Sequence, residues 1–148
     1  MNTMSRCIRS SLLLALTMAC AMPAMAQDAR KVNPAQLYNY WILLNTKVQV
    51  DLPMSGANLL KPGCVAVSYI IGSDGVPRNV KIQKTEPQSG LGPAAVSAVS
   101  NFRYGPSLTN HNSDPVSTYY VVPFNAPDDK AQRQQIMDAC KLPGYDQA

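Results

Sequence analysis

Residues 63–106 decide the fold, and they read GCVAVSYIIGSDGVPRNVKIQKTEPQSGLGPAAVSAVSNFRYGP. Apolar side chains occupy every second position from Val65 to Ile71, which predicts a strand with one face toward a core. A Ser-Asp-Gly turn at residues 73–75 provides the glycine that a tight hairpin needs. Val80 and Ile82 then resume the alternation, so this part of the chain predicts a β-hairpin.

A helix is predicted after the hairpin, because the period of the apolar residues changes beyond Gly90. The recurring positions are Leu91, Ala95, Val96 (or Ala98), Val99 and Phe102. We therefore expect a helix near Leu91–Asn101, and Tyr104-Gly105-Pro106 ends this segment.

This order of motifs closely resembles the C-terminal domain of TonB-family proteins, from about Pro53 to Phe124. The matching features are the alternating strand, the Asp-Gly turn, the Ala-Ala-Val-x-Ala-Val helix and the Phe-Arg-Tyr-x-Pro end. The resemblance implies an α+β fold: a three-stranded antiparallel sheet with a helix packed on one face, flanked by N- and C-terminal helices. It also implies a non-catalytic periplasmic binding module whose last strand pairs with a short segment of an outer-membrane receptor.

The flanking helices have their own signals. An Asn-Pro-Ala-Gln sequence at residues 33–36 provides a cap, a first-turn proline and a capping-box glutamine, which predicts a helix from about Pro34 to Asn45. Asp128 is the expected cap of a C-terminal helix that carries Ile136 and Cys140 on one face.

The predicted core joins the inward face of the sheet to the central helix, and residues 51–62 and 107–115 are predicted loops. The expected core residues are Val65, Val67, Tyr69, Ile71, Val80, Ile82, Ala95, Val99, Phe102, Val122 and Phe124.

The last predicted strand, Ser117–Asn125, contains Pro123. Proline has no N–H, so it occurs on edge strands or at strand ends. An edge strand can pair with another extended chain, which is the basis of peptide capture by strand addition. The residues predicted to form this peptide-binding edge are Ser117, Thr118, Tyr119, Tyr120, Val121 and Val122. An edge blunted by Pro123 or covered by the C-terminal helix is the alternative.

The N-terminus predicts export. Arg6 and Arg9 precede an apolar stretch that ends at Pro23 and the small-residue site Ala24-Met25-Ala26, as in a cleavable secretory signal peptide. The apolar run is shorter than the roughly 20 residues that span a bilayer. We expect cleavage after Ala26 and a periplasmic location; an uncleaved anchor and a lipid on Cys20 are the alternatives.

Four segments follow from these predictions: a signal peptide (1–26), an N-terminal helical extension (27–52), a TonB C-terminal-like domain (53–126), and a C-terminal helix and tail (127–148). Energy-transducing members of the family keep an uncleaved membrane helix and a long Pro-rich spacer, and neither pattern is predicted here. Leu52-Pro53 stands where the family often has Tyr-Pro, and Phe102 replaces a common tryptophan. These departures argue against energy transduction and leave the predicted fold intact.

The two cysteines beyond the signal peptide, Cys64 and Cys140, predict a disulfide, because the periplasm is oxidising. Cys64 has the opposite parity to Val65 and Val67, so its side chain should leave the core face. The bridge would attach the C-terminal helix to the sheet. Two separate free thiols are the alternative.

The composition indicates no catalytic or nucleic-acid function. Of 13 basic residues, two leave with the signal peptide, so 11 face 9 acidic residues and the net charge becomes +2. No basic run remains that would favour nucleic acid. Nucleophile-elbow, zinc-protease and phosphate-loop motifs are missing, and the single histidine, His111, lies in a polar Asn-His-Asn turn. We expect no enzyme activity, cofactor, metal or small-molecule substrate.

Three functions therefore stay open. The first is a periplasmic adaptor that binds a protein or peptide partner, such as an outer-membrane receptor segment, and serves transmembrane transport in a Gram-negative envelope. The second is an inhibitor or immunity-type protein on the same small scaffold. The third is a structural module associated with the cell wall.

Overall fold

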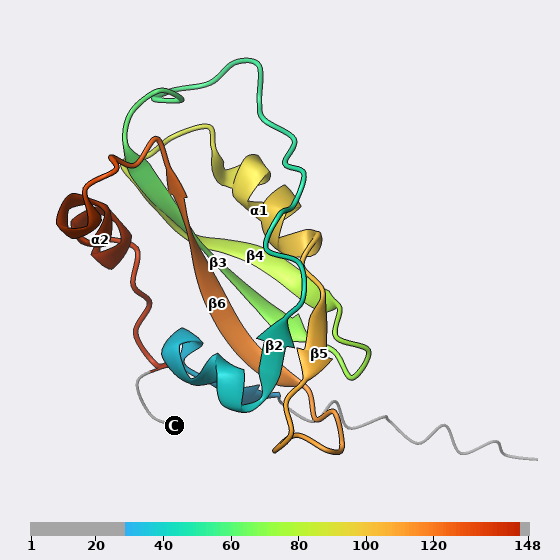
Figure 1. Cartoon of the computed structure of the whole chain (residues 1–148). Coiled ribbons are helices and arrows are strands. Elements are labelled where there is room, and N and C mark those ends of the chain that lie inside the picture. Colours follow the sequence, from blue (N-terminus) through green and yellow to red (C-terminus); the bar gives the residue numbers. More distant parts are fainter. Residues whose placement is uncertain (1–28, 146–148) are drawn as a thin grey trace, which may run out of the picture.

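A four-stranded sheet forms the middle layer of the protein, with α1 on one face and α2 on the other (Figure 1). The computed structural model describes residues 29–145; the predicted signal peptide lies outside them. In spatial order the strands are β1 (Arg30–Lys31), β6 (Val116–Phe124), β3 (Gly63–Ile71) and β4 (Pro77–Glu86). The mixed helix and strand content confirms the α+β class.

The antiparallel part of the sheet is β4-β3-β6, with β3 in the centre. The sheet has one strand more than predicted, because β1 pairs in parallel with the start of β6. Two residues are too few to give a periodic signal in the sequence. Val32, just beyond β1, is held there by its N–H to the Ser117 carbonyl at 2.8 Å.

The β3–β4 hairpin turns through Gly75, as predicted. Its φ of +74° lies in the left-handed region, and a Cβ there would be 2.0 Å from the carbonyl oxygen of Tyr104. The Gly75 carbonyl in turn accepts a hydrogen bond from the Tyr104 N–H at 2.9 Å. Any larger residue would therefore disturb both the turn and its contact with the segment after α1.

The main core lies between the sheet and α1 (Gly92–Ser100), and most of its predicted members are buried there. Val80, Val122 and Phe124 are only partly buried at its margin. Ile82 is a wrong prediction, since 46% of its surface is exposed. It lies on the outer strand β4 beside Gly92 of α1, which has no side chain to cover it; a Cβ at Gly92 would be 2.6 Å from the Ile82 Cδ1.

A second, smaller core lies on the opposite face and contains Cys64, Ala66 and Tyr119. It is covered by α2 (Lys130–Asp138) and the residues that follow. The predicted disulfide is confirmed: Cys64 and Cys140 are bonded, with Cα atoms 6.1 Å apart. The cap of α2 is Asp129 and not Asp128, because the Oδ1 of Asp129 accepts the Gln132 N–H at 2.8 Å.

The predicted helix from Pro34 to Asn45 is wrong in its second half. A 3₁₀ helix, η1 (Pro34–Asn39), begins at the predicted Asn33 cap and gives way to a strand, β2 (Trp41–Leu43). This strand pairs with β5 (Tyr104–Pro106), which the sequence indicated only as the end of a helical segment. Aromatic and β-branched residues suit a strand once a partner is present, so the tertiary pairing overrides the helical spacing.

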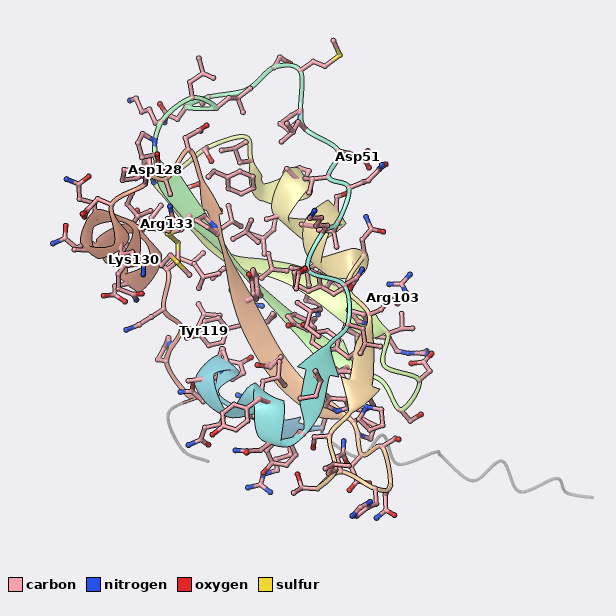
Figure 2. The ribbon with its side chains drawn as sticks, in the orientation of Figure 1. Asp51, Arg103, Tyr119, Asp128, Lys130 and Arg133 are labelled. Atoms are coloured by element: carbon pink, nitrogen blue, oxygen red, sulfur yellow. A yellow bond between two sulfur atoms is a disulfide. The ribbon has the colours of Figure 1, made fainter. Side chains whose placement is uncertain are left out.

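The segment after β2 runs along α1 and holds it against the sheet (Figure 1). Asn45 donates to the carbonyl of Asn101 at 2.7 Å, and the Asn101 side chain donates to the Gln49 carbonyl at 3.0 Å. The Ser97 hydroxyl donates to the carboxylate of Asp51, which Figure 2 shows beside α1. The predicted loop at residues 51–62 contains no helix or strand.

The disulfide should make a large contribution to stability. Replacing Cys64 and Cys140 together by alanine should lower the free energy of unfolding by about 4 kcal/mol in the chain-entropy account, because the bridge closes a loop of 76 residues. Urea unfolding followed by the emission of Trp41, the single tryptophan, measures the change. Reduced wild-type protein is the control and should match the double variant. Two titratable thiols in protein purified from the periplasm would contradict the prediction.

Candidate functional site

The outer edge of β6 is open over a short stretch. In an antiparallel ladder each residue directs its N–H and C=O to one side, and successive residues alternate. The Ser117 carbonyl faces away from β3, because it accepts the Val32 N–H. Tyr119, Val121 and Pro123 therefore also face away from β3. Within residues 29–145, the backbone groups of Tyr119 and Val121 have no hydrogen-bond partner.

The open edge is shorter than the six residues predicted. Thr118, Tyr120 and Val122 direct their backbone groups to β3, and Ser117 is already paired with β1. The main-chain groups available to a partner are those of Tyr119 and Val121. Pro123 ends this stretch, since its missing N–H would have pointed to the same open side, which agrees with the expected place of proline in an edge strand.

A groove with a volume of 310 Å³ runs beside this edge. Tyr119, Tyr120 and Val121 line its floor. One wall is the start of η1, at residues 33–35, and the other comes from α2 and its C-terminal side, through Gln134, Met137 and Lys141. Figure 2 shows Tyr119 between α2 and η1. The C-terminal helix therefore flanks the edge.

The ring of Tyr119 holds the C-terminal tail beside the groove. It packs edge-on against Tyr145, with ring centroids 4.9 Å apart. The Lys31 ammonium lies 5.7 Å from the centre of the Tyr145 ring, at a distance typical of cation–π contact. These contacts join β1, β6 and the tail on the α2 face of the sheet.

A second hollow, the aromatic cavity, lies on the other side of β6, between η1, β2 and the sheet. Its volume is 270 Å³, and among residues 29–145 no charged side chain lines it. We define it by its main lining residues, Leu37, Trp41, Leu43, Tyr69, Tyr104 and Tyr120. The edge residue Tyr119 also lines it, so the cavity and the groove meet at β6.

Two buried tyrosines form the polar part of this cavity. The hydroxyls of Tyr69 and Tyr104 are 2.6 Å apart and share a hydrogen bond. Burial raises the pKa of Tyr69 well above its ordinary value, and the neighbouring Tyr104 raises it further. Burial also raises the pKa of Tyr104 to about 12, against the opposing effect of the hydrogen bond shared with Tyr69. Both hydroxyls are therefore protonated and uncharged at neutral pH.

Sequence reasoning found Tyr69 as a core residue but missed the cavity. Tyr104 appeared only as part of a helix end, and Trp41 as part of a helix. The pairing of β2 with β5 brings Trp41 to the same cavity as the tyrosine pair, a long-range arrangement that has no local sequence signal.

Residues 29–145 contain no group of three His, Cys, Asp or Glu side chains placed to hold a metal ion. No helix within this range has the length and hydrophobicity to cross a membrane. His111 is exposed in its polar loop, as expected.

The tyrosine pair should make the protein sensitive to alkali. Stability that depends on the raised pKa values is present below pH 10, the ordinary pKa of tyrosine, and is lost as the pH rises through about 12. Absorbance titration should show two of the seven tyrosines ionising after the others. The double variant Tyr69→Phe/Tyr104→Phe should remove the late phase, whereas the control variant Tyr38→Phe, at a 64% exposed position, should leave the late phase unchanged. A single phase for all seven would contradict this.

Comparison with known proteins assigns a family to the part of the chain that forms most of the sheet and its central helix. The family described as Gram-negative bacterial TonB protein C-terminal matches residues 49–125, just over half of the chain. No curated protein and no solved structure matches this chain. The match spans β3, β4, α1, β5 and β6, and leaves out β1, η1, β2 and α2. Domains of this family are non-catalytic protein-interaction modules of the cell envelope, and this chain belongs to the TonB C-terminal domain family.

Proposed function

We propose that this protein is an exported periplasmic binding module that captures an extended segment of another envelope protein by strand addition. The observation that carries the proposal is the open edge of β6 at Tyr119 and Val121. Their backbone N–H and C=O groups can pair with an incoming strand, which would supply affinity through the main chain. The parallel pairing of β1 supports this, because β1 already pairs with the same outer edge of β6 at Val116 and Ser117, just before Tyr119.

The flanking elements would supply selectivity. A strand added beside Tyr119 and Val121 would lie between η1 and α2, in the groove described above. Pro123 limits its extent at one end, and Val32 limits it at the other. The module should therefore recognise a short extended segment, such as the periplasmic end of an outer-membrane receptor.

The proposal includes the predicted signal peptide. In this reading, cleavage after Ala26 releases the module into the periplasm without an energy-transducing anchor. The domain would then bind its partner without transmitting force from the inner membrane. Its role in transport would be that of an adaptor.

The matched pair Val121→Pro and Val121→Thr tests the main-chain mechanism. Proline removes the outward N–H, and the neighbouring Pro123 shows that this side of β6 tolerates it. Threonine keeps the N–H and changes only the side chain. We expect Val121→Pro to weaken partner binding about fivefold, since the lost hydrogen bond contributes about 1 kcal/mol, and Val121→Thr to bind nearly as wild type.

The partner is identified first by a photo-crosslinking residue at Gln134, which lines the groove. Peptides from the crosslinked segment are then titrated calorimetrically against both variants, with circular dichroism as the test of folding. Undiminished peptide binding by folded Val121→Pro protein would rule out strand addition at this edge. Binding that needs the whole folded partner would favour an inhibitor, and crosslinks confined to glycan would favour a cell-wall module.

A further inference from the structure

We infer that the aromatic cavity is the specificity pocket of this module and takes one tyrosine-like side chain of the captured peptide. The inference rests on the proposed function and adds the chemical identity of the residue that is recognised. Four features of the cavity support it: its size, its lack of charge, its hydroxyl pair and its position beside the open edge.

The size and lining of the cavity suit a single aromatic side chain. Its volume of 270 Å³ is at the lower limit for pockets that hold drug-sized ligands. Its walls are aromatic and aliphatic side chains, among them Trp41, Tyr69 and Tyr104. A charged side chain would find no opposite charge there and would lose its hydration. An aromatic ring carries no charge that needs hydration, and it would gain apolar contact with the walls.

The hydroxyl pair adds a polar requirement. Tyr69 and Tyr104 are only 2% and 6% exposed, and each hydroxyl carries one proton. One proton is used in the bond between them, so the second has no acceptor among residues 29–145. A phenol oxygen could accept it, whereas a phenylalanine ring could not. Because both hydroxyls stay protonated at neutral pH, this preference should be constant from about pH 6 to 9.

The position of the cavity connects it to the open edge. The side chains of a strand point alternately to the two faces of its sheet. Tyr120 faces the aromatic cavity, and Tyr119 and Val121 lie on the α2 face with the groove. A strand added beside β6 would likewise direct one side chain toward the cavity and the next toward the groove. The walls formed by η1 and β2 lie outside the family match, so this chain adds the cavity to the common sheet.

Small probes test the cavity directly. Trp41, the single tryptophan, lines the cavity, so its emission on excitation at 295 nm reports occupancy. N-acetyl-tyrosinamide should change this emission saturably and bind about fivefold more tightly than N-acetyl-phenylalaninamide, the effect of one hydrogen bond. The double variant Tyr69→Phe/Tyr104→Phe should abolish the difference between the probes. Leu108→Ala, at an 89% exposed position away from the cavity, is the matched control and should retain it.

A random dodecapeptide library, displayed and selected on the mature protein, tests whether the occupant is part of a captured peptide. Wild-type protein should enrich tyrosine at one position, and the double phenylalanine variant should accept phenylalanine there equally well. Peptides that lose binding to Val121→Pro but show no aromatic preference would overturn this inference and leave the proposed function standing. Selected peptides that are insensitive to Val121→Pro would overturn strand addition. Saturable probe binding without any peptide enrichment would make the cavity a small-molecule site and also overturn the inference.

Discussion

The alternation of side chains along β3 is the constraint on which the rest of the structure depends. β3 is paired on both edges, and its side chains point alternately to the two faces of the sheet. Val65, Val67 and Tyr69 point to α1, and Cys64 and Ala66 point to α2. A sheet with both faces covered follows from this one strand. The disulfide, which joins Cys64 to Cys140 just beyond α2, then attaches this helix to the second face.

The open edge of β6 is a consequence of the same pairing. Once the even-numbered residues of β6 bond to β3, the odd-numbered ones must face outward. β1 and Val32 occupy the first of these outward positions, and Pro123 removes a donor from the last. Between these positions, the outward backbone groups of Tyr119 and Val121 are unpaired within residues 29–145. This arrangement keeps the exposed edge short, which protects the protein from uncontrolled pairing between sheets while leaving room for a specific strand.

The common fold and the chain's own additions have different parts in the site. The matched residues 49–125 provide the sheet, the edge and the buried Tyr69–Tyr104 pair. Both walls of the groove, and the η1–β2 side of the cavity, come from segments outside that range. In the proposed function, binding by the main chain is thus combined with walls from segments outside the family match. Selectivity should therefore reside in η1, β2 and α2.

The sequence by itself determined the hairpin, the central helix, the family and the disulfide. These features follow from local periodicity, from one turn glycine and from an even pair of cysteines in a chain whose sequence predicts export. Tertiary structure alone decided that Trp41 lies in a strand, that Arg30 and Lys31 extend the sheet, and that Ile82 is left half exposed. Two of these depend on a partner distant in the chain, β5 for Trp41 and β6 for β1, and the third depends on how Gly92 of α1 packs beside Ile82. A local pattern cannot encode a partner that only the folded chain brings into contact, and the open edge and the cavity arise from such contacts.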